Sequence, residues 1–131
     1  GTGDPSITIA QAIPNASVLI VTTPQEVALA DVRRSVSLFR KFDLNIVGMV
    51  ENMSYFMCGH SSEPITIFGS GGGEKLSAEL GLPLLGTVPI EPDISKGGDS
   101  GEPLMMSSES SEAGQVIKSV VQAIVAGLSK A

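Results

Sequence analysis

The sequence is poor in the residues that bind nucleic acids or anionic membranes. Its 131 residues include no tryptophan and one tyrosine, and eight Lys or Arg stand against fourteen Asp or Glu, a formal net charge of -6. Because nucleic acids and anionic lipid surfaces attract cationic protein surfaces, we expect no nucleic acid and no membrane among the partners. Apolar runs are much shorter than the ~20 residues of a membrane-spanning helix, and the N-terminus lacks the basic and apolar regions of a signal peptide.

Cysteine is nearly absent as well. A single cysteine cannot form an internal disulfide, which is compatible with a reducing compartment, and we expect a cytoplasmic protein. What the chain does contain suits a globular core, since 42% of its residues are hydrophobic and 17% are charged. The length fits one domain or a large piece of one.

Three continuous apolar runs have the pattern of strands that are buried on both faces of a parallel sheet. They cover Ser17–Thr22, Asn45–Val50 and Leu84–Val88. Apolar residues at three- and four-residue steps predict helices over 25–42, from the Gly71–Gly73 run to Gly81, and over 110–128. The last helix is expected to carry one apolar stripe, consisting of Ala113, Ile117, Val120, Val121, Ile124 and Leu128.

The alternation of strands and helices predicts an α/β fold, with right-handed crossovers and a parallel sheet covered by helices. Asp4 before Pro5 is interpreted as the N-cap of a short helical turn that runs to Ala12. The stretch from Glu51 to about Ser70 is expected to be a long loop, and 92–103 is expected to be a loop too. Because three strands are few for such a sheet, we expect an incomplete one.

Five segments in this order and spacing carry a family resemblance: GTGD, VTTPQEVALADVRRS, GMVENMSYF, IFGSGGGEKL and LLGTVPIEPDI. From Gly1 to about Pro103, the chain resembles the C-terminal half of the Mrp/NBP35 (ApbC-like) family of P-loop iron–sulfur cluster carrier ATPases. The resemblance implies part of a deviant-Walker-A fold, like that of MinD and the nitrogenase iron protein. It also implies ATP with Mg, a homodimer with a bridging iron–sulfur cluster, and apoproteins that receive the cluster.

The phosphate-binding loop of such an ATPase is not found in the sequence. No GxxxxGK[ST] occurs, and the cluster Gly69–Gly73 before Lys75 has the wrong spacing and no Ser or Thr after the lysine. The resemblance also puts the magnesium-supporting aspartate upstream of this sequence. We therefore interpret residues 1–131 as the C-terminal part of one P-loop ATPase domain that lacks the Walker A loop. The chain alone is expected to have no catalytic residues and no ATP hydrolysis.

The resemblance assigns nucleotide contacts to Gly1, Asn52, Pro89 and Ile90. Gly1 matches the glycine whose amide senses the terminal phosphate, although a first-residue glycine can also be a cloning remnant. Asn52 matches an amide that pairs with the adenine edge, a task suited to a group that both donates and accepts; the alternative is a turn-forming Asn. The backbone of Pro89 and Ile90 matches the segment that lines the adenine. For Asp4 the N-cap interpretation is preferred to catalysis.

One departure from the family concerns the cluster ligands. Relatives with a cluster carry CxxC at this point, so that two subunits supply four thiolates. Here Cys58 occupies the first position and Ser61 the second, and a serine hydroxyl is a poor iron ligand compared with thiolate. A dimer offers two Cys58 thiolates, with His60 as a further candidate ligand in a different register. The alternative is a lone cysteine beside a solvated histidine.

Two other functions share parts of this pattern. A MinD- or ParA-like positioning ATPase has the same fold, but it usually carries a cationic membrane or DNA-binding surface, which the last helix lacks. A noncatalytic domain that dimerises through exposed core surface is the second alternative.

Overall fold

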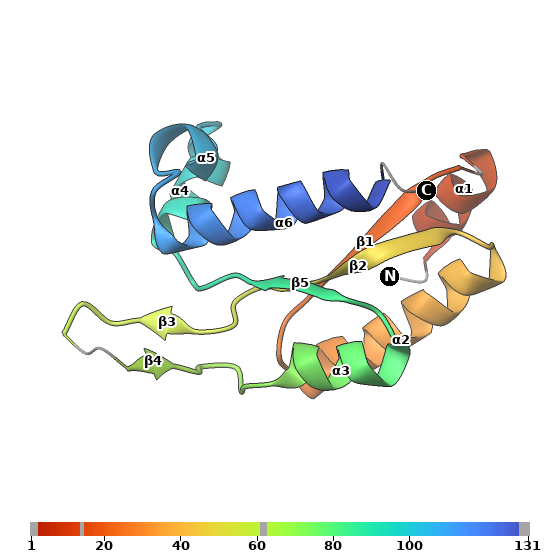
Figure 1. Cartoon of the computed structure of the whole chain (residues 1–131), viewed down its shortest axis with the longest axis horizontal. Coiled ribbons are helices and arrows are strands. Elements are labelled where there is room, and N and C mark those ends of the chain that lie inside the picture. Colours follow the sequence, from red (N-terminus) through yellow and green to blue (C-terminus); the bar gives the residue numbers. More distant parts are fainter. Residues whose placement is uncertain (1–2, 14, 61–62, 129–131) are drawn as a thin grey trace.

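A computed structural model describes residues 3–13, 15–60 and 63–128, and within these ranges it shows an α/β unit (Figure 1). Its sheet has three parallel strands in the order β1-β2-β5. The described elements are α1 (Asp4–Ala12), β1 (Ser17–Thr22), α2 (Glu26–Lys41), β2 (Asn45–Glu51), β3 (Phe56–Met57), β4 (Pro64–Ile65), α3 (Gly72–Leu80), β5 (Leu84–Thr87), α4 (Pro92–Ser100), α5 (Leu104–Ser107) and α6 (Glu112–Leu128).

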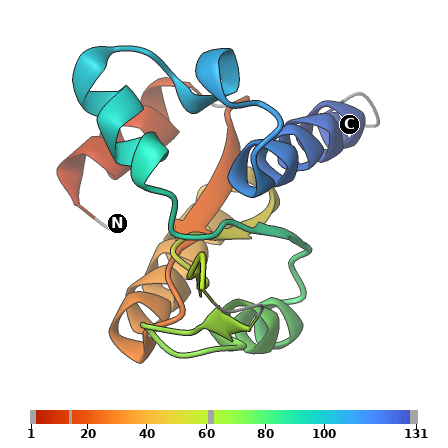
Figure 2. The same cartoon turned by 90° about the vertical axis from the view of Figure 1, so that its left-hand side faces the viewer.

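Helices cover the two faces of the sheet (Figures 1 and 2). α2 and α3 lie on one face and α6 lies on the other. Because side chains alternate between faces along a strand, Met49 of β2 packs with α2 and α3, and its neighbour Val50 packs with α6. Each face has its own core. The first holds Ile20, Leu29, Val32, Val36, Met49, Leu76 and Leu82, and the second holds Val50, Val88, Leu104, Ala113 and Val120.

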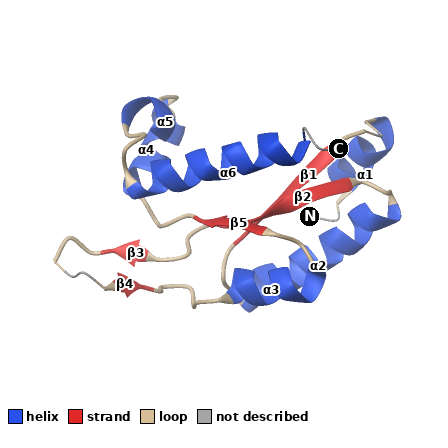
Figure 3. Cartoon of the chain, in the orientation of Figure 1, coloured by secondary structure: helices blue, strands red, loops and turns tan. Residues whose placement is uncertain are grey.

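Most of the predicted elements are confirmed, with small shifts at their ends (Figure 3). β1 has the predicted bounds, and β2 runs one residue further, to Glu51. α3 ends at Leu80 because Gly81 takes the left-handed conformation at φ 64°, which lets the chain leave the helix. The predicted parallel α/β sheet covered by helices is therefore the observed fold.

Three predictions of local structure were wrong. Gly3 is the N-cap of α1, and Asp4 is the first helical residue, without a side-chain cap bond. The segment 92–103 is not a loop, because Pro92 begins α4 at a position that suits its fixed φ and Ile94 packs against the core under α6. The expected loop after Glu51 contains an antiparallel hairpin, in which Phe56 pairs with Ile65.

The sheet is open at β1. Within the described residues β1 pairs on one side only, with β2. Val21, near its end, keeps 58% of its surface exposed, an unusual value for a β-branched residue in a sheet. Within residues 3–13, 15–60 and 63–128, no helix has the length and apolar character needed to cross a bilayer.

Candidate functional site

The segments that follow β2 and β5 run side by side at the carboxyl edge of the sheet. The carbonyl of Glu51 accepts from the Val88 N–H at 2.8 Å, and the Ser54 N–H donates to the Val88 carbonyl at 3.0 Å. The Ile90 N–H then donates to the Tyr55 carbonyl at 2.7 Å. Ligands of open α/β sheets bind outside this edge, so residues 51–55 and 88–90 form one candidate site.

Asn52 is half-buried at the first step of this segment. Its N–H donates to the Thr22 carbonyl at 2.7 Å, which ties it to the end of β1. Its side-chain Oδ1 accepts from the Met53 N–H at 2.9 Å, so the turn-forming role has a structural counterpart. The structure gives Nδ2 no partner within the described residues, which leaves that donor available to a ligand.

Pro89 and Ile90 lie beside this segment, as their positions after β5 require. Pro89 is buried and Ile90 is half-buried. Proline has no N–H, and the N–H of Ile90 already donates to the Tyr55 carbonyl. The backbone of these two residues can therefore offer a ligand carbonyl acceptors and no donor. Gly1, the remaining residue of the predicted nucleotide set, lies outside the described residues.

The β3–β4 hairpin extends away from the sheet (Figure 1) and carries Cys58 just beyond β3. Cys58 is half-buried and free, and His60 is exposed. Exposed apolar side chains accompany them: Met57 (39%), Ile65 (48%) and Ile67 (54%). Ser61 lies outside the described residues. Within residues 3–13, 15–60 and 63–128, no group of three or more His, Cys, Asp or Glu side chains is arranged to hold a metal ion.

Sequence reasoning missed the carboxyl group that joins this site to α3. Glu51 is only 4% exposed, and its Oε2 accepts the Gly73 N–H at 2.5 Å. Its Oε1 accepts the hydroxyl of Ser54. The sequence did contain a signal: Glu51 continues an apolar strand, and a charged group in such a place is rarely buried without hydrogen-bond partners.

Tyr55 was missed as well. Its hydroxyl donates to Glu112 Oε1 at 2.7 Å, which connects the exit of the site with the first turn of α6. Burial raises the pKa of Tyr55 to about 12, and the hydrogen bond to Glu112 and its negative charge add to the effect. The phenol is therefore neutral at physiological pH and acts as a donor.

The glycine cluster at the start of α3 contacts this carboxyl group at the place where a phosphate would approach a helix N-terminus. The Gly73 N–H points to Glu51, and the Lys75 ammonium lies 3.2 Å from Glu26 Oε1. A hollow of about 180 Å³ lies nearby, lined by Glu51, Ser54, Tyr55, Pro64, Thr66, Ser70, Gly71, Glu74 and Thr87. Two carboxyl groups in this lining make it unsuitable for a phosphate.

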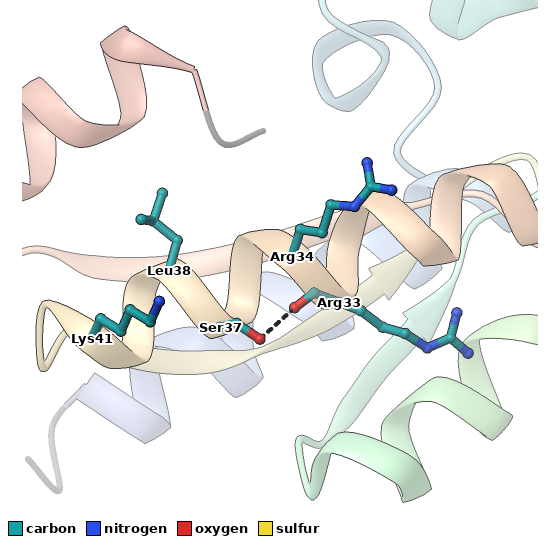
Figure 4. A pocket seen from close by; sticks show the side chains of 5 residues that line it. All are labelled: Arg33, Arg34, Ser37, Leu38 and Lys41. Carbon is teal, nitrogen blue, oxygen red and sulfur yellow. Dashed lines mark hydrogen bonds between the residues drawn. The ribbon is translucent and has the colours of Figure 1, made fainter.

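A second hollow, of about 390 Å³, lies on α2 and is lined by Arg33, Arg34, Ser37, Leu38 and Lys41 (Figure 4). Arg33 extends toward α3, where it pairs with Glu79 at 2.8 Å. Every lining residue comes from one helix, and none is an acid or a thiol. The hollow therefore offers no carboxylate, imidazole or thiol ligand for a metal, and it shares no residue with the edge described above.

A family model described as ParA, NUBPL iron-transfer P-loop NTPase, matches residues 1–125. The chain is 43% identical to an iron–sulfur cluster carrier protein of Synechocystis sp. over 132 residues, which are 100% of the chain and 37% of that protein. It is 44% identical over 128 residues to the Arabidopsis thaliana iron–sulfur protein required for NADH dehydrogenase, mitochondrial, with 98% and 41% covered. The chain thus spans well under half the length of these relatives.

Solved structures agree on the fold. A nucleotide-binding protein from Archaeoglobus fulgidus in complex with ADP is similar with a TM-score of 0.68 at 32% identity, covering 78% of this chain and 42% of that one. The cell division ATPase MinD of Pyrococcus furiosus is similar with a TM-score of 0.63 at 25% identity, with 82% and 41% covered. The shared feature is the parallel sheet with helices of P-loop NTPases.

Proposed function

The chain belongs to the NUBPL iron-transfer P-loop NTPase family, and on that premise we propose that residues 1–131 are the C-terminal part of one P-loop ATPase domain without its Walker A loop. The complete protein is an ATP-binding iron–sulfur cluster carrier. This segment holds the adenine side of its nucleotide site and the loop that contacts the cluster. The observation that carries the proposal is the family match over residues 1–125.

The adenine side consists of Asn52, Pro89 and Ile90. Its support is the backbone pairing between residues 51–55 and 88–90, which brings all three to the carboxyl edge of the sheet. The Nδ2 of Asn52, which has no partner among the described residues, would donate to a ring nitrogen of adenine, while carbonyls of the 88–90 segment would accept from its amino group. Gly1 would sense the terminal phosphate, and ATP would bind with Mg through groups that precede this segment.

The iron–sulfur cluster is the cargo, and Cys58 is its proposed ligand. One thiolate per chain is too few for a stable cluster, so a homodimer would bring two Cys58 residues together, with Ser61 or His60 as weaker ligands. The exposed apolar side chains of the hairpin suit a contact with a second subunit or an apoprotein that receives the cluster. A cytoplasmic location belongs to the proposal, since a reducing compartment keeps this thiol free.

Anaerobic reconstitution of the complete protein with iron and sulfide tests cluster carriage. We expect a brown dimer with visible absorbance, loss of that colour in Cys58→Ala, and a more persistent colour in Ser61→Cys, which restores two thiolates per chain. Ser110→Cys is the matched control, because it adds a thiol outside the hairpin. If the wild type and Ser61→Cys both stay colourless as proper dimers, cluster carriage at this loop is wrong.

Nucleotide binding needs a separate test. In the complete protein, Asn52→Ala should weaken ADP binding by roughly tenfold, the loss expected for one or two hydrogen bonds to a ligand. Asn45→Ala, a change of the same kind at the opposite end of β2, should leave affinity unchanged. Equal affinity of Asn52→Ala and wild type would remove Asn52 from the site. The coding sequence upstream of Gly1 tests the domain assignment, because the proposal requires a phosphate-binding loop there.

A further inference from the structure

Glu51 joins three parts of the chain through one buried carboxyl group. Of the acidic side chains in the described residues, it is the one that is almost completely buried, at 4% exposure. One oxygen binds the backbone of Gly73 in the first turn of α3, and the other binds the hydroxyl of Ser54. We name Glu51, Ser54 and Gly73 the Glu51 clasp.

The Glu51 clasp lies beside a backbone turn whose conformation is intrinsically unfavourable. Met53 has φ 55°, a left-handed conformation that a residue with a Cβ seldom adopts. Contacts on both sides of Met53 hold it there. The Asn52 N–H bonds to Thr22, the Ser54 N–H bonds to Val88, and the Ser54 side chain bonds to Glu51. Beyond this turn, Tyr55 leads directly into β3 and the Cys58 hairpin.

Glu51 and α3 pack closely against each other at Gly73. A Cβ added at Gly73 would lie 2.8 Å from Glu51 Oε2 and 3.1 Å from Glu51 Cβ, so this contact depends on glycine. A hydrophobic side chain would fill the end of a buried strand without the cost of desolvating a carboxyl group. The carboxyl group does what an apolar residue cannot: it binds two donors in fixed directions.

We propose that Glu51 is a positioning residue that sets the direction in which the Cys58 hairpin leaves the sheet and holds Asn52 at the proposed adenine side. This inference rests on the proposed function for the roles of Asn52 and Cys58. Within the described residues, the hydrogen bonds of the carboxyl group go to Gly73 and Ser54. It acts through the turn at Met53, which lies between Asn52 and the Cys58 hairpin.

The rate at which Cys58 reacts with a thiol reagent tests the inference in the chain itself. Cys58 is the one cysteine of the sequence, so the reaction reports on the hairpin alone. Glu51→Ala should raise the rate roughly tenfold or more, because it removes two hydrogen bonds that oppose local opening. Gly73→Ala should raise it too, because the added Cβ displaces the carboxyl group.

Two variants separate positioning from general stability. Glu51→Gln keeps an oxygen that can accept from Gly73, so it should restore a rate close to that of the parent chain. Glu74→Ala removes an exposed carboxyl group from the residue after Gly73, which lines the same hollow as Glu51. This variant should leave the rate unchanged. Circular dichroism must show each variant folded at the temperature used. If Glu51→Ala does not fold, Gly73→Ala and Ser54→Ala give the result.

Parental Cys58 rates in folded Glu51→Ala and Gly73→Ala would overturn the inference, as would an equal increase in Glu74→Ala. The measurement needs no nucleotide and no cluster. A colourless reconstitution would therefore refute the proposed cargo and leave the positioning role intact. Unchanged thiol rates beside a brown dimer would refute the positioning role alone.

Discussion

The hydroxyl of Tyr55 donates to the carboxylate of Glu112 at 2.7 Å, across 57 positions of the sequence. This contact links the exit of the candidate site to the first turn of α6, the helix that covers one face of the sheet. Together with the bond from Gly73 to Glu51, it attaches the segment between β2 and the hairpin to helices on both faces. The segment that carries Asn52 is therefore supported from two sides.

The ionisation of Tyr55 can be followed directly, because the chain has one tyrosine and no tryptophan. Ultraviolet absorbance of the phenolate should show a midpoint near pH 12, since the pKa of Tyr55 is raised from 10.0 to about 12. Glu112→Gln should lower the midpoint only part of the way, because burial is the largest cause. Glu102→Gln, an exposed acid elsewhere, should not shift it.

The same shift fixes the sign of the stability change. Above pH 10 the unfolded chain loses the phenolic proton while the folded chain keeps it, so the free energy of unfolding should fall as pH rises from 10 toward 12. Tyr55→Phe should abolish that dependence. A midpoint near 10 in a chain that is still folded by circular dichroism would contradict the prediction.

The pair Arg33 and Glu79, which joins α2 to α3 through two bonds of 2.8 Å, gives a prediction at acid pH. Arg33 holds the pKa of Glu79 below its ordinary value of 4.5, chiefly through their hydrogen bond. The stabilisation is present above pH 4.5 and disappears as pH falls below it. Urea denaturation should therefore separate the parent from Glu79→Gln at neutral pH and bring them together in acid. Glu74→Gln, on the same helix, should show a smaller difference at neutral pH.

Two glycines isolate the effect of backbone conformation on stability. A Cβ at Gly81 or at Gly98 would meet no atom within 4 Å, but Gly81 has φ 64° and Gly98 lies inside α4 without a positive φ. Gly81→Ala should therefore lower the free energy of unfolding by about 1 kcal/mol, and Gly98→Ala should raise it by up to about 1 kcal/mol. If urea denaturation showed that both substitutions change the free energy of unfolding in the same direction, the backbone conformations of Gly81 and Gly98 would not be as described.

Local patterns predicted the sheet well because its strands are buried on both faces. Apolar runs such as Ser17–Thr22 have few alternatives to that structure, and Gly81 marked the end of α3 in the sequence. The prediction of a loop over 92–103 failed because Pro92 stands at a helix start, where its fixed φ suits the first turn. Contacts of Ile94 with the distant α6 core stabilise α4, and no local pattern contains them.

The candidate site divides in the same way. The positions of Asn52, Pro89 and Ile90 after strands were predictable because strand ends meet at one edge of a parallel sheet. The bonds from Glu51 to Gly73 and from Tyr55 to Glu112 join residues 22 and 57 positions apart. Such pairs depend on how the helices pack, so a single sequence could not supply them.

The chain alone should not hydrolyse ATP. The N-terminus of α3 is occupied by Glu51, and Lys75 lies beside Glu26, so neither is placed to neutralise a transferred phosphoryl group. Phosphate release should match a protein-free blank, and Lys75→Ala should change nothing. Turnover that is lost in Lys75→Ala, but kept in Lys96→Ala, would make the glycine cluster a working phosphate site.

The surface beside β1 leads to the last prediction, that the chain associates with itself. Two of the six apolar residues expected along one stripe of α6, Val121 and Leu128, are exposed at 52% and 45%. Val21 of β1 is 58% exposed, and β1 has one paired side within the described residues. An open strand edge and uncovered apolar side chains both favour association. Sedimentation velocity should therefore show a mass that grows with concentration. Val21→Lys should shift the chain toward monomer, because a charged side chain blocks strand pairing there. Val27→Lys adds the same charge at a valine that is 78% exposed at the start of α2, outside the strand, and should leave association unchanged. A single monomeric species at micromolar concentration would refute the prediction, and equal effects of the two lysine variants would move the contact away from β1.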